Sequence, residues 1–228
     1  MPLDAFEALR TVPLFREVPE TELQAIARLV RERQFPKGSL ILSEGDPGDA
    51  LYFIVHGQVK VTVVAEDGRE VILSVLGDGA FFGEMALLDD EPRSAHVISM
   101  DDTTLLQLRR EDFRTRLQQA PELAVSLLRE LSRRLRPADS TIASLMLLDV
   151  NGRIARLLLE LAREDSPEGT RITRRLTHAA IGQMVGASRE TISRAMRSLV
   201  LRNVVSVSRR DITLLDPGAL RLAAQQQP

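Results

Sequence analysis

The chain of 228 residues contains no cysteine and no long apolar run. Without cysteine it can form no disulfide, no thiolate iron–sulfur cluster and no thiolate zinc site. No apolar stretch reaches membrane-spanning length, and the first ten residues, MPLDAFEALR, are acidic and amphipathic, unlike a signal peptide. We therefore expect a soluble, cytoplasmic protein with no membrane partner.

Histidine is also scarce: the three histidines, His56, His96 and His178, are far apart, and no His-x-His pair occurs. A cupin-type enzyme holds a metal in the mouth of a β barrel through clustered histidines and carboxylates. The sequence has no such cluster. We expect no metal site and no catalytic residues, so a metal enzyme is the weakest alternative.

Charge is divided unevenly along the chain. Residues 1–170 carry 20 basic and 29 acidic side chains, a net charge of −9, whereas residues 171–228 carry ten Arg and three acidic side chains, a net charge of +7. A basic module that displaces counterions from phosphates binds nucleic acid in a salt-dependent way. The C-terminal part is therefore expected to bind double-stranded DNA.

Residues 181–197, IGQMVGASRETISRAMR, have the pattern of a helix-turn-helix. Thr177 can cap the first helix and Ser188 the second, while Gly186 permits a tight turn between them. The second helix has an apolar face for burial, formed by Ile192, Ala195, Met196 and Leu199. The alternative is an ordinary amphipathic surface helix with solvated charges.

The opposite face of the second helix carries groups that can read DNA. Arg189 and Glu190 fall in its first turn and Arg194 lies one turn further along. Arg can donate two hydrogen bonds to guanine, and Glu can accept from the cytosine amino group. Thr191 and Arg197 are better suited to phosphates.

Two β-rich runs follow, at 204–207 and 212–215. Arg209 and Arg210 lie between them. This pattern predicts a winged hairpin whose tip touches the phosphate backbone.

The first half of the chain is typical of a β domain, because short apolar runs are separated by glycine turns. Strands are expected at 40–42, 51–55, 59–64, 71–75, 96–99 and 104–108, with helices at about 20–31 and from Arg110 onward. Such strands assemble into an antiparallel barrel or jelly roll. We predict an α+β protein with a jelly-roll domain at 1–118, a long helix and hinge at 119–148, and a winged helix-turn-helix domain at 149–228.

The long helical pattern has an apolar seam with alternating steps of three and four residues, as in a coiled coil. The seam consists of Leu128, Leu131, Leu135, Ala138, Ile142 and Leu145. Pro137 interrupts it at a cost on the order of 3 kcal/mol unless a kink is useful. One alternative is a helix that packs only on its own barrel. We expect a parallel homodimer, because paired DNA-reading helices match a palindromic site.

A second motif, FGEMALLDDEPRSA, occupies residues 82–95. Gly83 exposes backbone N–H groups, Arg93 offers a two-pronged donor and Ser94 adds a hydroxyl. These three groups can hold a phosphate. Glu84 is suited to accept from a ribose hydroxyl, so the segment is typical of a nucleotide-sugar site. A surface turn with a solvated Arg is the alternative.

With these motifs in this order, the chain resembles the cyclic-AMP receptor protein and FNR (CRP/FNR) family of bacterial transcription regulators over almost its full length. The resemblance rests on FGE, RSA, RRL, LLDVNGRIA and GASRETISR. It implies a cyclic-nucleotide-binding domain, a dimerisation helix, a winged helix and RNA polymerase as a partner. It also implies that Arg189, Glu190 and Arg194 prefer TGTGA-like half-sites.

By the same resemblance, Glu84 binds the ribose hydroxyl, Arg93 and Ser94 bind the cyclic phosphate, and Gly83 and Ala95 contribute backbone groups. The full set of candidate ligand-binding residues is Gly83, Glu84, Met85, Arg93, Ser94, Ala95, Arg134, Ala138 and Asp139. The candidate DNA-binding residues are Thr177, Ser188, Arg189, Glu190, Thr191, Arg194, Arg197, Arg209 and Arg210.

The chain departs from the cyclic-AMP-binding members at one point. Counted from the shared RRL motif, Ala138 and Asp139 stand where those members carry a Thr-Ser pair facing the adenine. Asp139 can accept from an exocyclic amine of adenine or guanine, and Ser140 or Thr141 can substitute for it if Pro137 alters the helix. Alternatively, Asp139 is a solvated residue beside the seam.

Cyclic AMP is the first effector expected, because the sugar and phosphate groups of the motif are complete. The alternatives are cyclic GMP, cyclic di-GMP and a constitutive regulator with no ligand. Haem is a further alternative, since members of the family bind it through His or a terminal proline, and Pro2 becomes terminal if Met1 is removed.

Overall fold

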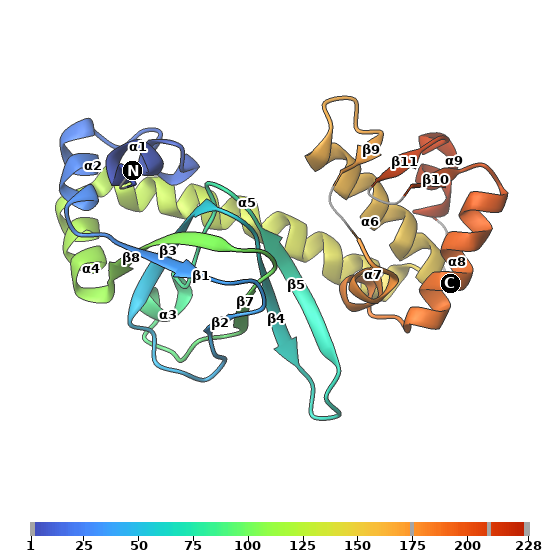
Figure 1. Ribbon diagram of the computed structural model, residues 1–228, viewed down its shortest axis with the longest axis horizontal. Helices are drawn as coiled ribbons and strands as arrows, with labels where there is room; N and C mark the ends of the chain where they lie inside the picture. Colours follow the sequence, from blue (N-terminus) through green and yellow to red (C-terminus); the bar gives the residue numbers. More distant parts are fainter. Residues whose placement is uncertain (1–2, 174–175, 209–210, 226–228) are drawn as a thin grey trace. The chain divides into compact units, whose positions relative to one another are not determined.

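The structure is a computed structural model that describes residues 3–173, 176–208 and 211–225. It divides into two compact units, residues 1–134 and 135–228. The longest helix, α5 (Pro121–Leu147), contributes to both units (Figure 1). Within the described residues, no helix is both long and apolar enough to cross a membrane.

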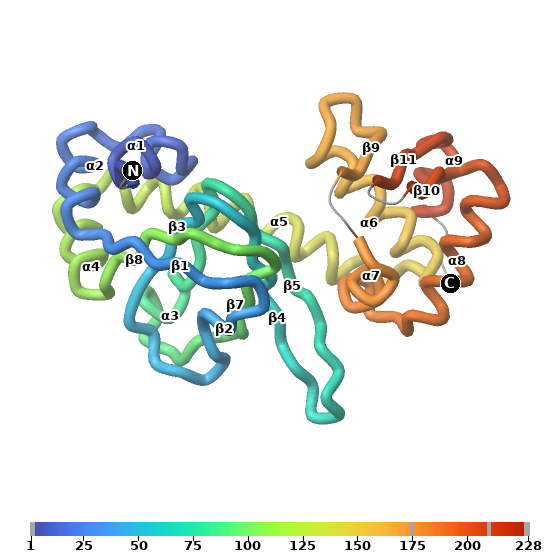
Figure 2. The backbone as a smooth tube through the Cα atoms, viewed as in Figure 1, coloured from blue at the N-terminus to red at the C-terminus, as the bar shows by residue number. Residues whose placement is uncertain are grey.

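The first unit is built on two four-stranded antiparallel sheets, ordered β1-β8-β3-β6 and β2-β7-β4-β5. Figure 2 shows β4 and β5 as a long hairpin. The strands are β1 (Arg31–Phe35), β2 (Leu40–Leu42), β3 (Ala50–His56), β4 (Val59–Val64), β5 (Glu70–Leu76), β6 (Phe81–Phe82), β7 (His96–Ser99) and β8 (Thr103–Arg109).

The centre of this unit is strand β3, which is buried on both faces. Because side chains alternate along a strand, Tyr52 and Ile54 point to the core between the two sheets. Leu51 and Phe53 point the other way, toward the helices. Two separate cores therefore share one strand, which explains its continuous apolar run.

Helices cover the outer face of the β3 sheet (Figure 1). They are α1 (Ala5–Arg10), the 3-10 turn η1 (Pro13–Phe15), α2 (Glu20–Ala27), α4 (Arg110–Gln119) and the start of α5. Leu123 and Leu127 of α5 lie in the core beneath them. The short helix α3 (Met85–Leu88) follows β6.

Six strand predictions are confirmed to within one residue at each end. The helix expected at about 20–31 was too long, because α2 ends at Ala27 and Arg31 begins β1. Strand β1 was missed because its sequence, RERQF, is mostly polar and exposed. It is held by backbone pairing with β8 rather than by an apolar face.

Helix α5 continues through Pro137. Proline has no N–H, so the carbonyl four residues earlier lacks its usual helical donor. Much of the predicted seam is exposed: Leu128, Leu135, Ile142 and Leu145 are each at least 50% exposed. Leu131 is different, since it packs partly against the core of the first unit.

The second unit contains the rest of α5, four further helices and a three-stranded sheet ordered β10-β11-β9 in its described part. These elements are α6 (Val150–Asp165), β9 (Arg171–Ile172), α7 (His178–Val185), α8 (Arg189–Leu201), β10 (Val205–Val207), β11 (Ile212–Leu214) and α9 (Pro217–Ala223). Asp149 caps α6 through the Gly152 N–H. Ile154, Ile181 and Ile192 lie in one core. The predicted α+β fold, with an N-terminal β jelly roll (the β roll), a long helix and a C-terminal winged helix-turn-helix, is confirmed.

Candidate nucleotide site and DNA-reading helix

The predicted phosphate-binding segment begins with a sharp turn between β6 and α3. Gly83 has φ +85°, a conformation that favours glycine. A Cβ placed there would lie 2.7 Å from Nη1 of Arg93 and 3.2 Å from the Ala50 carbonyl oxygen. Glycine is thus required both by the backbone angle and by the close approach of the arginine.

Arg93 is buried and held by three hydrogen bonds. Its Nη1 donates to the Gly83 carbonyl at 2.6 Å, and its Nη2 donates to the Ala50 carbonyl at 2.8 Å. Nη2 also donates to Oδ1 of Asp49 at 3.0 Å. The Asp49 side chain is 71% exposed, so a buried cation is paired with an acid at the surface.

Glu84 is buried and only 6% exposed. Its Oε1 accepts from Nη1 of Arg134 at 3.3 Å. Burial raises the pKa of Glu84 above the ordinary glutamate value, while the positive charges of Arg134 and Arg93 oppose that rise. The residues predicted to bind the ribose and the phosphate, Glu84 and Arg93, are therefore both buried charged groups of one short segment.

Arg134 connects α5 to this segment. Besides Glu84, it donates from Nη2 to the Phe81 carbonyl at 2.8 Å, and its guanidinium lies 4.1 Å from the centre of the Phe81 ring. Such a cation–π contact adds to the hydrogen bonds. The structure thus brings Arg134 together with Glu84, while their role in binding a nucleotide stays a prediction.

The other predicted ligand-binding residues lie in different environments. Ser94 is exposed, and its hydroxyl lies 3.8 Å from Sδ of Met85. Met85 is itself half-exposed, and Ala95 is buried. Ala138 and Asp139 are exposed on the part of α5 that belongs to the second unit. Their contribution to the site stays a prediction.

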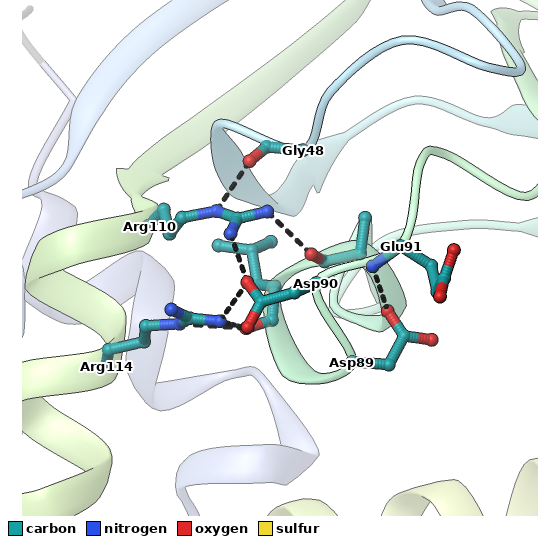
Figure 3. A network of polar contacts seen from close by, with 8 residues as sticks. Gly48, Asp89, Asp90, Glu91, Arg110 and Arg114 are labelled. Atoms are coloured by element: carbon teal, nitrogen blue, oxygen red, sulfur yellow. Dashed lines mark hydrogen bonds and ion pairs between the residues drawn. The ribbon is translucent and has the colours of Figure 1, made fainter.

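A polar network that the sequence did not reveal holds α3 in place (Figure 3). Arg110 donates to the carbonyls of Gly48 and Ala86 and to the Asp90 carboxylate. Arg114 donates to the Leu87 carbonyl and to the same carboxylate. The pKa of Asp90 is lowered chiefly by the hydrogen bond from Arg114. Two arginines of α4 thus fix the end of the segment.

Gly48 shows how closely these parts pack. A Cβ on Gly48 would lie 2.6 Å from Cβ of Ala86. The loop before β3 therefore approaches α3 at a distance that only glycine permits.

The local structure predicted for the helix-turn-helix is confirmed. The Thr177 hydroxyl accepts from the Ala180 N–H at 3.1 Å, and the Ser188 hydroxyl accepts from the Thr191 N–H at 3.2 Å. Gly186 lies in the left-handed region with φ +67° and ends α7. These three residues set the ends of both helices.

Gly182 is a further determinant of the turn, which the sequence reasoning missed. A Cβ on this buried residue would lie 2.6 Å from the Ala187 carbonyl oxygen. The Ala187 N–H donates to the Gly182 carbonyl at 2.9 Å. Glycine here lets the chain fold back tightly against α7.

The second helix, α8, is amphipathic in the predicted way. Ile192 and Met196 are buried, and Ala195 and Leu199 pack against the same core. The candidate base readers Arg189, Glu190 and Arg194 are all exposed. Arg197 is exposed as well, and Thr191 is half-buried.

Glu190 is held ionised near the start of α8. Its pKa is lowered first by its own backbone N–H and then by the Ser188 hydroxyl. An ionised carboxylate is acceptor-only, which is the state needed to accept from a cytosine amino group.

The predicted wing is present as the antiparallel pair β10 and β11. Val205 pairs with Leu214 and Val207 with Ile212. Arg209 and Arg210, the predicted phosphate contacts, lie outside the described residues, so their role stays a prediction.

Known proteins match both halves of the chain. Residues 32–120 match the cyclic nucleotide-binding domain model, and residues 152–223 match the Crp-like helix-turn-helix domain model. A "CRP-like cAMP-activated global transcriptional regulator" of Mycobacterium tuberculosis is 34% identical over 222 residues, which cover 96% of this chain and 99% of the relative. The chain belongs to the CRP/FNR family of transcription regulators.

Other members of the CRP/FNR family agree over nearly the whole chain. The cyclic AMP receptor protein of Thermus thermophilus is 35% identical over 216 residues, covering 92% of this chain and 98% of that relative. The crystal structure of the Thermus thermophilus catabolite activator protein superposes with a TM-score of 0.55 at 34% identity, covering 93% of this chain and 98% of that one. The structure of a second CRP/FNR regulator from that organism superposes with a TM-score of 0.69 at 29% identity, covering 87% of this chain and 100% of that one.

Membership in the CRP/FNR family identifies the chain as a DNA-binding transcription regulator with a cyclic-nucleotide-binding domain. This family consists of regulators rather than enzymes. Among the described residues, no group of three or more His, Asp or Glu side chains could hold a metal ion.

Proposed function

We propose that this protein is a homodimeric, sequence-specific transcription regulator gated by a cyclic nucleotide, with cyclic AMP as the first candidate. The observation that carries the proposal is the buried pair of charged groups in residues 83–93. Glu84 suits a ribose hydroxyl and Arg93 suits a cyclic phosphate. Asp49 holds Arg93 and Arg134 holds Glu84, so both buried charges are kept in fixed positions. Two buried charged groups positioned in this way in one short segment are typical of a ligand site.

The names of the relatives support cyclic AMP. The regulator from Mycobacterium tuberculosis is named as cAMP-activated, and the Thermus thermophilus relative is named a cyclic AMP receptor protein. We extend that ligand to this chain as a proposal, with residues Gly83, Met85, Ser94 and Ala95 completing the site.

On DNA, α8 would enter the major groove of a TGTGA-like half-site. Arg189, Glu190 and Arg194 would contact base edges. Phosphate contacts would come from Thr177, Ser188, Thr191 and Arg197, and from Arg209 and Arg210 of the wing. RNA polymerase would be a partner at the promoter, in the cytoplasm where the DNA is.

The exposed seam of α5 supports the homodimer. Leu128, Leu135, Ile142 and Leu145 are exposed at intervals of seven and three residues on one helix. Apolar side chains in this pattern pack against a second copy of the same helix. Two copies of α8 would then address the two half-sites of a palindrome.

We propose that the nucleotide shifts the dimer between arrangements that hold the two recognition helices poorly or well for consecutive major grooves. Arg93 and Glu84 would tie the nucleotide to the β roll, and the 133–141 segment of α5 would cover the base. The differential affinity of the nucleotide for the two arrangements sets the size of the effect.

A second candidate function follows from the residues that are expected to face the nucleotide base. Ala138 cannot hydrogen-bond through its side chain, and Asp139 is acceptor-only when ionised, unlike a Thr-Ser pair. This observation favours either a different cyclic nucleotide, such as cyclic GMP or cyclic di-GMP, or a regulator that binds DNA constitutively.

The test is calorimetric titration of the whole protein with cyclic AMP, cyclic GMP and cyclic di-GMP, followed by binding to a TGTGA palindrome with and without the best ligand. We expect cyclic AMP to bind and to tighten DNA binding. The Arg93→Ala protein should stay folded and bind the nucleotide at least about tenfold more weakly, because it can no longer donate charge-assisted hydrogen bonds to the phosphate.

Arg69→Ala, an exposed substitution in the β4–β5 hairpin, is the control for removing an arginine. Strong DNA binding without any nucleotide binding would instead establish a constitutive regulator. Normal nucleotide affinity in Arg93→Ala would refute the proposed phosphate ligand.

A further inference from the structure

The first unit holds a cavity of about 520 Å³ that is separate from the predicted nucleotide segment. Four arginines line it: Arg31, Arg33, Arg109 and Arg110. Its acidic lining residues are Asp49 and Glu111. The other lining residues are Gly48 and Gln107.

The fold gathers these arginines from three neighbouring elements, β1, β8 and α4. Strands β1 and β8 are antiparallel with Arg31 opposite Gln107, and every second residue of a strand shares a face. Arg31, Arg33 and Arg109 therefore lie on one face of the sheet. Helix α4 begins directly after β8, which adds Arg110 to the same edge.

The positive charge of the cavity is opposite in sign to the net charge of the first unit. Residues 1–134 carry 16 basic and 23 acidic side chains, so a four-arginine cavity is a local reversal of sign. Arg109 is the N-cap residue of α4 and Arg110 is its first residue, and no side chain caps the helix. Cations at the positive end of a helix are unfavourable, although Glu111 and Asp112 in the first turn offset part of this effect.

The arginines also differ in how they are engaged. Arg33 donates to Gln107, and Arg110 belongs to the network around Asp90. Within the part of the chain that the structure describes, Arg31 and Arg109 form no ion pair, and both are exposed. Of the two acids, Asp49 is already paired with Arg93. Positive charge at the cavity is thus only partly neutralised.

We propose that this cavity binds a compact polyanion with two or more phosphate groups, such as a small molecule bearing a pyrophosphate. Guanidinium groups match phosphate oxygens in a two-pronged geometry, and several of them can share one pyrophosphate. The volume suits a small molecule. None of the described residues that line the cavity is aromatic, so it offers phosphate contacts rather than a platform on which a base could stack.

This site is distinct from the one that would hold the cyclic phosphate. Arg93 is not among the lining residues. The two sites adjoin at Asp49, whose carboxylate accepts from Arg93, and at Gly48 and Arg110, which contact α3. None of the residues predicted to bind the nucleotide lines the cavity, so the proposal does not depend on which nucleotide, if any, the protein binds. Arg110 anchors α3, so a test should spare it.

The experiment is calorimetric titration of the full-length protein with inorganic pyrophosphate at low ionic strength. Arg31→Gln with Arg109→Gln removes two cavity charges that make no ion pair. Arg16→Gln with Arg28→Gln is the matched control, since both residues are exposed and lie outside the cavity. We expect one pyrophosphate per chain at this site, about tenfold or more weaker binding in the cavity variant, and unchanged binding in the control.

Two further variants show where pyrophosphate sits. Loss of this binding in Arg93→Ala, with normal binding in the cavity variant, would put the pyrophosphate in the nucleotide segment and overturn the proposal. Loss in Arg189→Gln with Arg194→Gln would put it on the DNA-reading helix, with the same consequence. Equal weakening of pyrophosphate binding in the cavity variant and its control would show that only the net charge of the protein matters, and it would overturn the proposal as well.

Absence of binding by the wild-type protein would also overturn the proposal. The proposal would be overturned too if an acidic peptide, such as hexaglutamate, bound at the same residues more tightly than pyrophosphate does. Thermal unfolding checks that each variant is folded, and the single variants Arg31→Gln and Arg109→Gln replace the double one if it is not.

Discussion

The Glu84 carboxylate and the Arg134 guanidinium lie 3.3 Å apart, and this ion pair joins the start of α3 to helix α5 within the first unit. The Arg134 side chain is only 28% exposed and the Glu84 side chain 8%. A buried pair of this kind is weak support for stability, because desolvation offsets the attraction between the charges. The ion pair matters for the geometry of the site, because it fixes the position of the Glu84 carboxylate in the segment that also holds the buried Arg93.

This relationship predicts how Glu84 affects stability with pH. Because burial raises its pKa, the folded protein holds the Glu84 proton more tightly than the unfolded chain does. The tighter proton binding adds to the free energy of unfolding. This contribution is fully present below the ordinary glutamate pKa of about 4.3, and it is lost as the pH rises through the higher pKa of the folded state. Glu84→Gln cannot ionise, so its stability relative to wild type should increase across that window.

The measurement is urea unfolding of both proteins at a series of pH values upward from about 4, taking the difference in unfolding free energy at each pH. Glu66→Gln, a substitution on the exposed β4–β5 turn, is the control. A difference that stays flat, or that falls with rising pH, would contradict the raised pKa.

The pairing of Arg93 with Asp49 leads to a prediction about ligand affinity. A phosphate that binds Arg93 has to share or displace the Asp49 carboxylate, which also repels it. Asp49→Asn should therefore strengthen nucleotide binding several-fold, roughly 3–10 times, because the competing negative charge is removed while the amide oxygen can still accept from Arg93.

Nucleotide titration of Asp49→Asn against Asp46→Asn measures this effect. Asp46 is exposed in the same loop, so its substitution makes the same change in charge nearby. The gain should shrink at high salt, as expected for an exposed charge. Weaker binding in Asp49→Asn would mean that Asp49 positions Arg93 rather than competing with the ligand.

Local signals made the DNA-reading part of the fold predictable. Thr177 and Ser188 cap helices through their own hydroxyl groups, and Gly186 supplies the left-handed turn. Each of these effects acts over about three residues, so the sequence alone contains the information. The apolar face of α8 follows from its 3.6-residue period.

The partners of Arg93 and the start of the β roll could not be predicted in this way. Asp49 is 44 residues away from Arg93, and nothing local relates the two. Strand β1 has no alternation of apolar and polar residues that would reveal it in the sequence. It is ordered by pairing with β8, about 70 residues later in the chain. The Asp90 network depends on two arginines of α4 that meet α3 only in the folded unit.

The cap of α8 can be tested directly. Ser188→Ala removes the acceptor for the Thr191 N–H and should lower stability by about 0.5–2 kcal/mol, fraying the turn that carries Arg189 and Glu190. DNA affinity should fall with it. Ser198→Ala, an exposed change inside the same helix, is the control and should cost nothing, since alanine is a strong helix former. Unfolding transitions and DNA titrations report both quantities, and unchanged stability in Ser188→Ala would show that the serine hydroxyl does not stabilise the start of α8.

Glu190 should determine base preference rather than overall affinity. Its exposed carboxylate is kept ionised by its own N–H and by Ser188, and an ionised carboxylate accepts from cytosine but repels acceptor atoms on other bases. Glu190→Ala should therefore lose roughly 1–3 kcal/mol of discrimination at one base pair of each half-site while leaving nucleotide affinity unchanged.

The measurement is DNA binding across a set of palindromes that differ at single positions, at several salt concentrations. Arg197→Ala is the informative comparison. If Arg197 contacts a phosphate as proposed, its removal should weaken the binding of all sequences alike and reduce the salt slope by about one. A Glu190→Ala protein that keeps the wild-type ranking of palindromes would show that base reading lies with Arg189 and Arg194 alone. Uniform weakening with a reduced salt slope would be unexpected for the loss of an acidic side chain, so the two variants separate base reading from phosphate binding on the same helix.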